Sequence, residues 1–235
     1  MTAVNKIMSS STIPTCKNTL SLRSASIDNY IAVLGAAKRY SEEQLVLGYR
    51  IGKAVAQIGK FLLTGATTGI PYAAAIGACD HGGFVLGISP ASNPNEHRNR
   101  YGKPDDFHHT IIYTGLGNDG RSPLIVRSAS IALFIGGEAG TLHEFTAAWL
   151  NGTPILGVLT GSGGIADELP RLAASFSTSF GSRLVVASDP VSLVETSFAA
   201  LLESSNSRKG TISSEASSVE NNVHDILASF RPSVI

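Results

Sequence analysis

Short apolar runs alternate with amphipathic segments along most of the chain. The runs YIAVLGA (30–36), KFLLTG (60–65) and SIALFIGG (130–137) are apolar at most positions, which is typical of parallel strands buried on both faces. The segments 41–59 and 141–152 instead begin with Ser or Thr and place apolar residues at helical spacing. The alternation recurs about seven times, so it predicts a Rossmann-like α/β fold: a doubly wound, mostly parallel sheet of about seven strands with helices on both faces.

The loops that follow the strands of such a sheet share one edge, which is where ligands bind in this class of fold. Several of these loops are rich in glycine. They contain Gly35, Gly65–Gly69, Gly115–Gly120 and Gly136–Gly140. We therefore expect the functional site at this edge. The polar stretch 88–106 is predicted to be a loop, and the helix that follows the next strand is predicted to start near Arg121.

The two ends of the chain differ in composition from the middle. Residues 1–27 are predicted to be a disordered or targeting segment, because residues 1–26 are rich in Ser and Thr and contain basic residues but no acid. Residues 204–235 are Ser-rich and are predicted to be a mostly disordered tail, in which VHDILASF is either a short amphipathic helix or unstructured. Residues 28–203 are expected to form the Rossmann-like nucleotide-binding domain.

The overall composition limits the classes of partner. Lys plus Arg and Asp plus Glu both number 18, so no net charge attracts the chain to nucleic acid or to an anionic membrane, and neither partner is expected. Two cysteines, Cys16 and Cys79, cannot form a disulfide framework, which favours a reducing compartment. No apolar run approaches the ~20 residues of a membrane-spanning helix. We expect a cytoplasmic protein, or an organellar one if residues 1–26 are a transit peptide.

Two further motifs have simple structural interpretations. GLGNDG (115–120) matches the glycine fingerprint of dinucleotide sites and would place Glu138 near a ribose, so a nicotinamide-dependent enzyme is one hypothesis. However, the motif follows the fourth expected strand, and Asn-Asp-Gly is ordinary turn chemistry. His108 and His109 are neighbours on an expected strand and should point to opposite faces, one exposed and one buried, so we expect no metal site.

The segment FIGGEAGTLHEF (134–145) follows a predicted buried strand and has two interpretations. Thr141 and Glu144 have the spacing of a capping box, an ordinary way to start a helix. Alternatively, the glycines let an anion approach the first turn of a helix that begins at Gly140-Thr141, where unpaired amides and the helix dipole favour phosphate. Glu144 would then stand beside the ligand, and Arg121 would bring a phosphate-binding guanidinium group to the same edge. The two interpretations are compatible.

These residues resemble the signature of the LONELY GUY family, also described as lysine decarboxylase-like. This family belongs, with the molybdenum-cofactor carrier proteins, to the Rossmann-like SLOG superfamily. Its signature is an arginine followed further along the chain by P-G-G-x-G-T-x-x-E. Arg121 falls on that arginine, Arg127 on a second one, and Gly140-Thr141-x-x-Glu144 on the closing motif, while Gly65–Gly69 falls at an earlier glycine loop of the family.

The match is imperfect in several places. Gly136 stands at the family proline, and Glu138 stands at its second glycine, within the loop expected to bind phosphate. Ser122 replaces the lysine that follows the family arginine. The stretch 88–106 has no counterpart in the cytokinin-activating members. The chain is therefore expected to be a divergent branch of the family.

The resemblance implies a protein that binds a small-molecule nucleotide and hydrolyses the N-glycosidic bond of a nucleoside 5′-monophosphate to free base and ribose 5-phosphate, with no required cofactor. By resemblance, Arg121 and Glu144 are the catalytic residues, and a carboxylate suits the oxocarbenium-like transition state. The alternative is a non-catalytic nucleotide sensor or molybdenum-cofactor carrier that uses the same loops. The expected phosphate- and nucleotide-binding residues are Gly35, Gly65, Thr67, Thr68, Gly69, Gly136, Gly137, Glu138, Ala139, Gly140 and Thr141.

Self-association is also expected. The family is usually dimeric, and the small-residue segment IPYAAAIGA (70–78) suits close packing of helices. We therefore predict a homodimer or a higher homo-oligomer.

Overall fold

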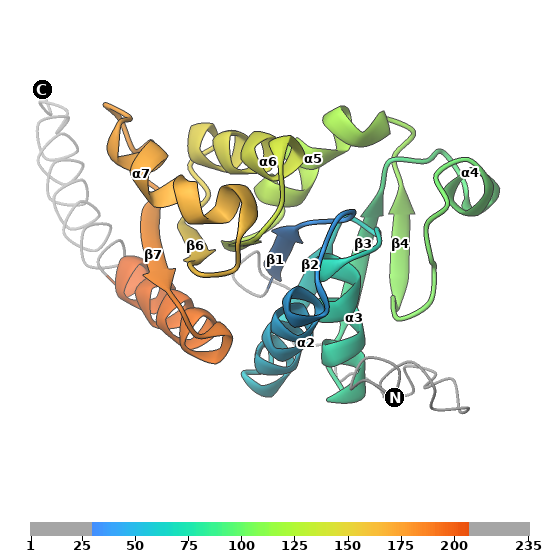
Figure 1. Ribbon diagram of the computed structural model, residues 1–235, viewed down its shortest axis with the longest axis horizontal. Coiled ribbons are helices and arrows are strands. Elements are labelled where there is room, and N and C mark those ends of the chain that lie inside the picture. Colours follow the sequence, from blue (N-terminus) through green and yellow to red (C-terminus); the bar gives the residue numbers. More distant parts are fainter. Residues whose placement is uncertain (1–29, 207–235) are drawn as a thin grey trace, which may run out of the picture.

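The computed structural model describes residues 30–206, so the expectations for residues 1–27 and for most of the tail lie outside the described residues. Within this range, seven parallel strands form one sheet with the order β4-β3-β2-β1-β5-β6-β7 (Figure 1). The strands are β1 (Tyr30–Gly35), β2 (Phe61–Thr64), β3 (Val85–Ser89), β4 (Thr110–Tyr113), β5 (Ile131–Ile135), β6 (Ile155–Leu159) and β7 (Arg183–Ala187). The strand β1 lies at the centre, and the later strands extend the sheet outward on both sides of it, so the predicted Rossmann-like, doubly wound fold is confirmed.

Helices cover both faces of the sheet. They are α2 (Glu42–Gln57), α3 (Ile70–Asp80), α4 (Pro94–Asn99), α5 (Gly117–Arg127), α6 (Ala139–Leu150), the 3₁₀ helix η2 (Gly164–Glu168), α7 (Leu169–Ala174) and a last helix over residues 190–206. The helices α2, α3 and the last helix share one core, and α5, α6 and α7 share the core on the opposite face (Figure 1). Within residues 30–206, no helix combines the length and apolar character needed to cross a membrane.

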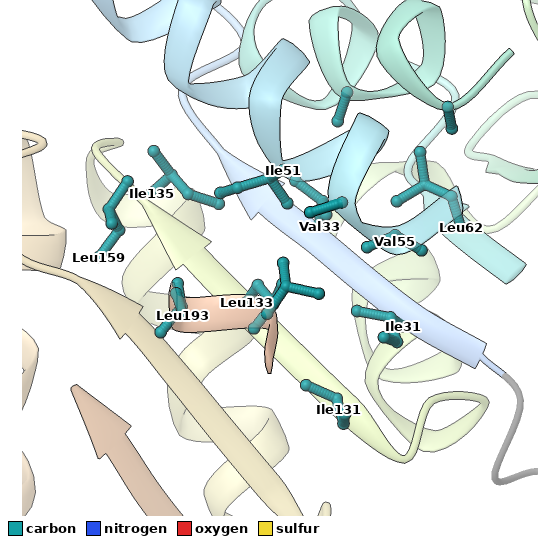
Figure 2. Close-up of a cluster of buried hydrophobic side chains, with 14 of the residues drawn as sticks. Ile31, Val33, Ile51, Val55, Leu62, Ile131, Leu133, Ile135, Leu159 and Leu193 are labelled. Carbon is teal, nitrogen blue, oxygen red and sulfur yellow. The ribbon is translucent and has the colours of Figure 1, made fainter. Parts of the chain in front are cut away.

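Successive residues of the central strand point into these two cores. Ile31 and Val33 belong to the core beneath α2, whereas Ala32 and Leu34 belong to the core beneath α5 and α6. All four are at most 1% exposed. Figure 2 shows the first core, in which Val33 lies close to Ile51 of α2. Burial on both faces explains why the strands appear in the sequence as continuous apolar runs.

The small residues of α3 pack against α2 within the same chain. A Cβ atom added to Gly52 would lie 1.9 Å from the carbonyl oxygen of Ala74, and one added to Gly77 would lie 2.1 Å from that of Tyr49. Glycine therefore lets the two helix backbones approach each other closely. The segment that was expected to favour self-association thus packs against α2 of the same chain. The oligomeric state stays a prediction.

Three local expectations were wrong or incomplete. The stretch 88–106, expected to be a loop, contains α4, which Asn93 caps by accepting a hydrogen bond from the amide of Glu96 (2.9 Å). The helix α5 starts at Gly117, one turn earlier than expected. The helix α6 starts at Ala139 with Glu138 at its N-cap, and no side chain caps it. Thr141 therefore lies inside the first turn, so it does not form a capping box.

Candidate functional site

A pocket of about 500 Å³ lies at the carboxyl ends of the central strands, at the edge predicted from the glycine loops. Its floor is the end of β1 and the residues that follow it, from Val33 to Lys38. The loop after β2 contributes Gly65 and Thr67 to one wall. The N-terminal parts of α5 and α6 and residues of the stretch 88–106 complete the lining. The pocket therefore joins segments from most of the chain length.

Arg121 of α5 and Glu144 of α6 form a buried pair in this pocket. Arg121 Nη1 lies 3.8 Å from Glu144 Oε1, and the two side chains are 8% and 12% exposed. The Ser122 hydroxyl donates a hydrogen bond to the same carboxylate oxygen (3.3 Å). This serine, which stands at the position of a family lysine, thus belongs to the site. The predicted catalytic pair is brought together, although its catalytic role is not tested by this geometry.

Burial governs the electrostatics of this pair. Loss of solvent raises the pKa of Glu144 above its ordinary value, while the charge of Arg121 and the Ser122 hydrogen bond act in the opposite direction. Burial likewise lowers the pKa of Arg121, and Glu144 opposes that shift. The Nε atom of Arg121 is buried and has no hydrogen-bond acceptor within residues 30–206. Perturbed groups of this kind facing a pocket are typical of functional sites.

Gly65 provides the space for the Arg121 guanidinium group. A Cβ atom at position 65 would lie 1.9 Å from Nη1 and 2.8 Å from Cζ of Arg121. Gly65 was expected to allow a ligand to approach the backbone. The structure shows that this glycine also accommodates the arginine against the carboxyl end of β2.

The stretch 88–106 brings cationic residues that the sequence analysis missed. Arg100, Tyr101 and Lys103 line the pocket. Lys103 Nζ donates a hydrogen bond to the hydroxyl of Thr67 (2.5 Å). Burial lowers the pKa of Lys103, and the nearby positive charges of Arg121 and Lys38 lower it further. The only available signal was a group of basic residues in a polar stretch that follows a strand.

A buried histidine anchors this stretch to the sheet. His97 of α4 is fully buried, and its two ring nitrogens lie 2.8 Å from the Ser89 hydroxyl and 3.1 Å from the Pro104 carbonyl oxygen. The Lys103 amide donates to the carbonyl oxygen of His97 (3.1 Å). His97 therefore fixes the backbone on both sides of Lys103, which holds the lysine over the pocket.

Glu138 lies at the rim of the pocket. Its carboxylate is 3.5 Å from the guanidinium group of Arg39, and the two side chains are 67% and 83% exposed. The pair is therefore well solvated and weak. The carboxylate that was unexpected in a phosphate loop is thus in contact with water and with a cation.

The predicted binding residues divide into two groups. Those that line the pocket are Gly35, Gly65, Thr67, Glu138, Gly140 and Thr141. Those that do not line it are Thr68, Gly69, Gly136, Gly137 and Ala139.

The second group of residues shapes the surrounding turns. The Thr68 hydroxyl donates to the Ala37 carbonyl oxygen (2.7 Å), and the Gly136 amide donates to the Ser162 hydroxyl (2.9 Å). A Cβ atom at Gly137 would lie 2.0 Å from Thr141 Oγ1. These contacts hold the glycine loops in place, and Gly140 and Thr141 are then presented to the pocket.

The remaining motifs have structural partners. His108 Nε2 lies 2.8 Å from Thr64 Oγ1, whereas His109 Nδ1 accepts from the Val85 amide (3.1 Å), and both rings are half-buried. Residues 30–206 contain no group of three His, Cys, Asp or Glu side chains placed to hold a metal. Arg127, at the C-terminal end of α5, donates to Asn151 Oδ1 (2.7 Å) and does not line the pocket.

The GLGNDG segment lies partly in a turn and partly in a helix. Gly115 precedes α5, while Gly117 begins it, and both have positive φ angles of 68° and 69°. Asn118 and Asp119 of the same segment line the pocket. The segment therefore contributes to one wall of the site described above.

The parallel sheet and the pocket at its carboxyl edge define a Rossmann-like protein of the nucleotide-binding type. The chain belongs to the SLOG cluster4 family, whose family model matches residues 28–193. The SLOG superfamily assignment made from the sequence motifs is thereby confirmed.

The chain is also similar to a curated relative and to solved structures. The chain is 32% identical over 122 residues to an uncharacterized protein of Archaeoglobus fulgidus, which covers 52% of this chain and 74% of the relative. The molybdenum cofactor binding protein of Rippkaea orientalis is 28% identical with a TM-score of 0.58, covering 72% of this chain and 94% of that one. The Moco carrier protein of Chlamydomonas reinhardtii is 27% identical with a TM-score of 0.58, covering 75% and 98%.

Proposed function

We propose that this protein binds a phosphorylated nucleotide-like molecule in the pocket. The observation that carries this proposal is the convergence of four cationic side chains on one cavity: Lys38, Arg100, Lys103 and Arg121. The first turn of α6, with Gly140 at the pocket wall, adds unpaired amides and the positive end of a helix dipole. We place the phosphate of the ligand there, as in the family that the sequence resembles.

We further propose that the bound nucleoside 5′-monophosphate is hydrolysed at its N-glycosidic bond. In this step the C1′–N bond breaks, the base leaves with the bonding electrons and takes up a proton, and water supplies hydroxide to C1′. Glu144 stabilises the oxocarbenium-like sugar and accepts the proton of the water. Burial shifts the pKa of Glu144 upward, in the direction of neutral pH, which suits a general base. Arg121 orients the nucleotide and stabilises developing negative charge.

The second candidate is a non-catalytic carrier of the molybdenum cofactor, with a nucleotide sensor as a related possibility. It is favoured by the similarity to two solved structures, a molybdenum cofactor binding protein at 28% identity and a Moco carrier protein at 27% identity. The molybdenum cofactor is a phosphorylated pterin, so the same cationic pocket suits its phosphate group. In this case Glu144 would accept hydrogen bonds from the heterocycle instead of activating water.

Purified protein incubated with a panel of nucleoside 5′-monophosphates distinguishes these candidates. Hydrolysis predicts free base, detected by chromatography, and its loss in Glu144→Gln. Glu168→Gln is the matched control, because Glu168 is an exposed carboxylate outside the pocket. Nucleotide or cofactor binding without base release would favour the carrier. Base release that is equally fast in Glu144→Gln would show that Glu144 is not the catalytic carboxylate.

A further inference from the structure

Two of the four cations in the pocket have no carboxylate partner among residues 30–206. Arg121 is paired with Glu144, and Arg100 lies 2.5 Å from Glu96. Within residues 30–206, neither Lys38 nor Lys103 forms an ion pair. These two lysines therefore form an uncompensated positive region at one side of the cavity.

Lys103 is held in this unfavourable position by the fold. Its ammonium group is half-buried, and its only hydrogen-bond acceptor among the described residues is the neutral hydroxyl of Thr67. The pKa of Lys103 is lowered by burial and by the charges of Arg121 and Lys38. The backbone beside it is held by the buried His97, which keeps the base of this side chain at the pocket. An anion between the lysines would relieve both the desolvation and the charge repulsion.

This region is separate from the place proposed for the ligand phosphate. Thr67 follows β2, whereas Gly140 follows β5, and β1 lies between these two strands in the sheet. Lys103 and the first turn of α6 thus lie on opposite sides of the floor formed by β1. A single phosphate at α6 would leave Lys103, on the β2 side of this floor, without an anionic partner among the described residues.

We propose that Lys103, Lys38 and the Thr67 hydroxyl form a second oxyanion subsite, so that the natural ligand carries two anionic groups. One group lies over the first turn of α6, and the other lies between the two lysines. The ligand class is a nucleotide-like molecule with a second phosphoryl or similar oxyanion group. This inference rests on the proposed function for the first group, while the lysine subsite itself is testable alone.

Isothermal titration calorimetry of the full chain tests this subsite with four probes: inorganic pyrophosphate, adenosine 5′-monophosphate, adenosine 5′-diphosphate and adenosine 3′,5′-bisphosphate. At least one of the two doubly phosphorylated nucleosides should bind about tenfold or more tightly than the monophosphate, which is the gain expected from a charge-assisted contact. Lys103→Met should remove this gain, and Lys38→Met should reduce it. Lys53→Met, a lysine of α2 outside the pocket, should leave it unchanged.

The stability of the variant separates a binding role from a structural one. Lys103→Met should not lower the melting temperature, because it removes a half-buried cation that lacks a carboxylate partner. Lys103→Arg should retain part of the gain. A lower melting temperature with unchanged probe affinities would show that Lys103 is structural and would overturn the inference.

The four probes also separate failure of this inference from failure of the proposed function. Equal binding of singly and doubly phosphorylated nucleosides, unaffected by Lys103→Met, would overturn the second subsite and leave nucleotide binding intact. Pyrophosphate binding that depends on Lys103, without binding of any nucleotide, would support the subsite and contradict the proposed function. Binding of no probe would overturn both.

Discussion

Replacement of Arg121 by Met should make the stability of the protein strongly dependent on pH. Arg121 Nη1 lies 3.8 Å from the Glu144 carboxylate, and both side chains are nearly excluded from solvent. At an effective dielectric constant of about 20, two unit charges at such a distance attract each other by about 4 kcal/mol. Without Arg121, burial would act on the pKa of Glu144 with only the Ser122 hydrogen bond opposing it.

The loss of stability in Arg121→Met has an upper limit, because the buried Glu144 can bind a proton and become neutral. At pH 7, protonating a carboxyl group whose pKa in the unfolded chain is about 4.3 costs about 3.7 kcal/mol, and at pH 5 it costs about 1 kcal/mol. The substitution also removes the cost of burying the arginine charge. We therefore expect the free energy of unfolding to fall by about 2–4 kcal/mol at pH 7 and by no more than about 1 kcal/mol at pH 5.

The direction of this pH dependence follows from the number of protons bound by the folded and unfolded states. In the variant, folded Glu144 has a raised pKa, so between the unfolded and folded pKa values the folded state binds the extra proton. Stability therefore falls as the pH rises through this window, and it recovers as the pH drops toward the unfolded pKa. The difference between variant and wild type should follow the same trend.

Urea unfolding at pH 5 and pH 7 measures this difference. The set contains wild type, Arg121→Met, Glu144→Gln and the double variant. The double variant removes both charges, so its loss of stability should vary with pH much less than that of Arg121→Met. An equal loss at both pH values for Arg121→Met, or no loss at pH 7, would refute the buried ion pair.

Three other sets of variants test the helix packing, the loop anchor and the pocket rim. Gly52→Ala should lower the free energy of unfolding by about 2 kcal/mol or more, because its Cβ would lie 1.9 Å from a backbone carbonyl oxygen of α3. Gly140→Ala has no atom within 4 Å of the new Cβ and should raise the free energy of unfolding by up to about 1 kcal/mol. Both variants are measured by urea unfolding, and a neutral Gly52→Ala would contradict the close packing of α2 on α3. His97→Leu should cost about 2–4 kcal/mol, because the Pro104 carbonyl oxygen and the Ser89 hydroxyl each lose their contact with the ring, and the hydroxyl keeps only the Ala91 amide. The same variant should weaken pyrophosphate binding in calorimetry; unchanged affinity would show that the loop does not need this anchor. Glu138→Gln should change stability by less than about 1 kcal/mol, since its pair with Arg39 is exposed, and should strengthen pyrophosphate binding; weaker binding would show that the carboxylate contacts the ligand favourably.

The strands and their order of appearance could be predicted because burial on both faces leaves a continuous apolar signal. The position of the site followed from the glycine loops, since the carboxyl ends of parallel strands meet at one edge. Arg121 and Glu144 were found by spacing within one short region of the chain. The start of α6 was misplaced, because Thr141 and Glu144 have capping-box spacing while the helix begins at Ala139.

Lys103 could not be placed from the sequence, because its position depends on contacts that are distant along the chain. Its partner Thr67 is 36 residues away, and the contact exists only because the stretch 88–106 folds back over β2. That return is fixed by His97, whose sequence context of polar residues resembles an exposed loop. The buried side chain of His97 thus holds the stretch 88–106 against the sheet, where its residues line one side of the pocket.

Glu138 posed the main objection to phosphate binding in the family manner, since a carboxylate repels a phosphate placed in the same loop. The structure weakens this objection on physical grounds. The side chain is 67% exposed and lies beside Arg39, so water and a neighbouring cation screen its charge. Glu144 is the more buried of the two carboxylates but is compensated by Arg121 at 3.8 Å. Four cations and three carboxylates, Asp119, Glu138 and Glu144, line the pocket. Because Lys38 and Lys103 have no anionic partner among the described residues, the side of the pocket near these lysines retains a local positive excess that favours an anionic ligand.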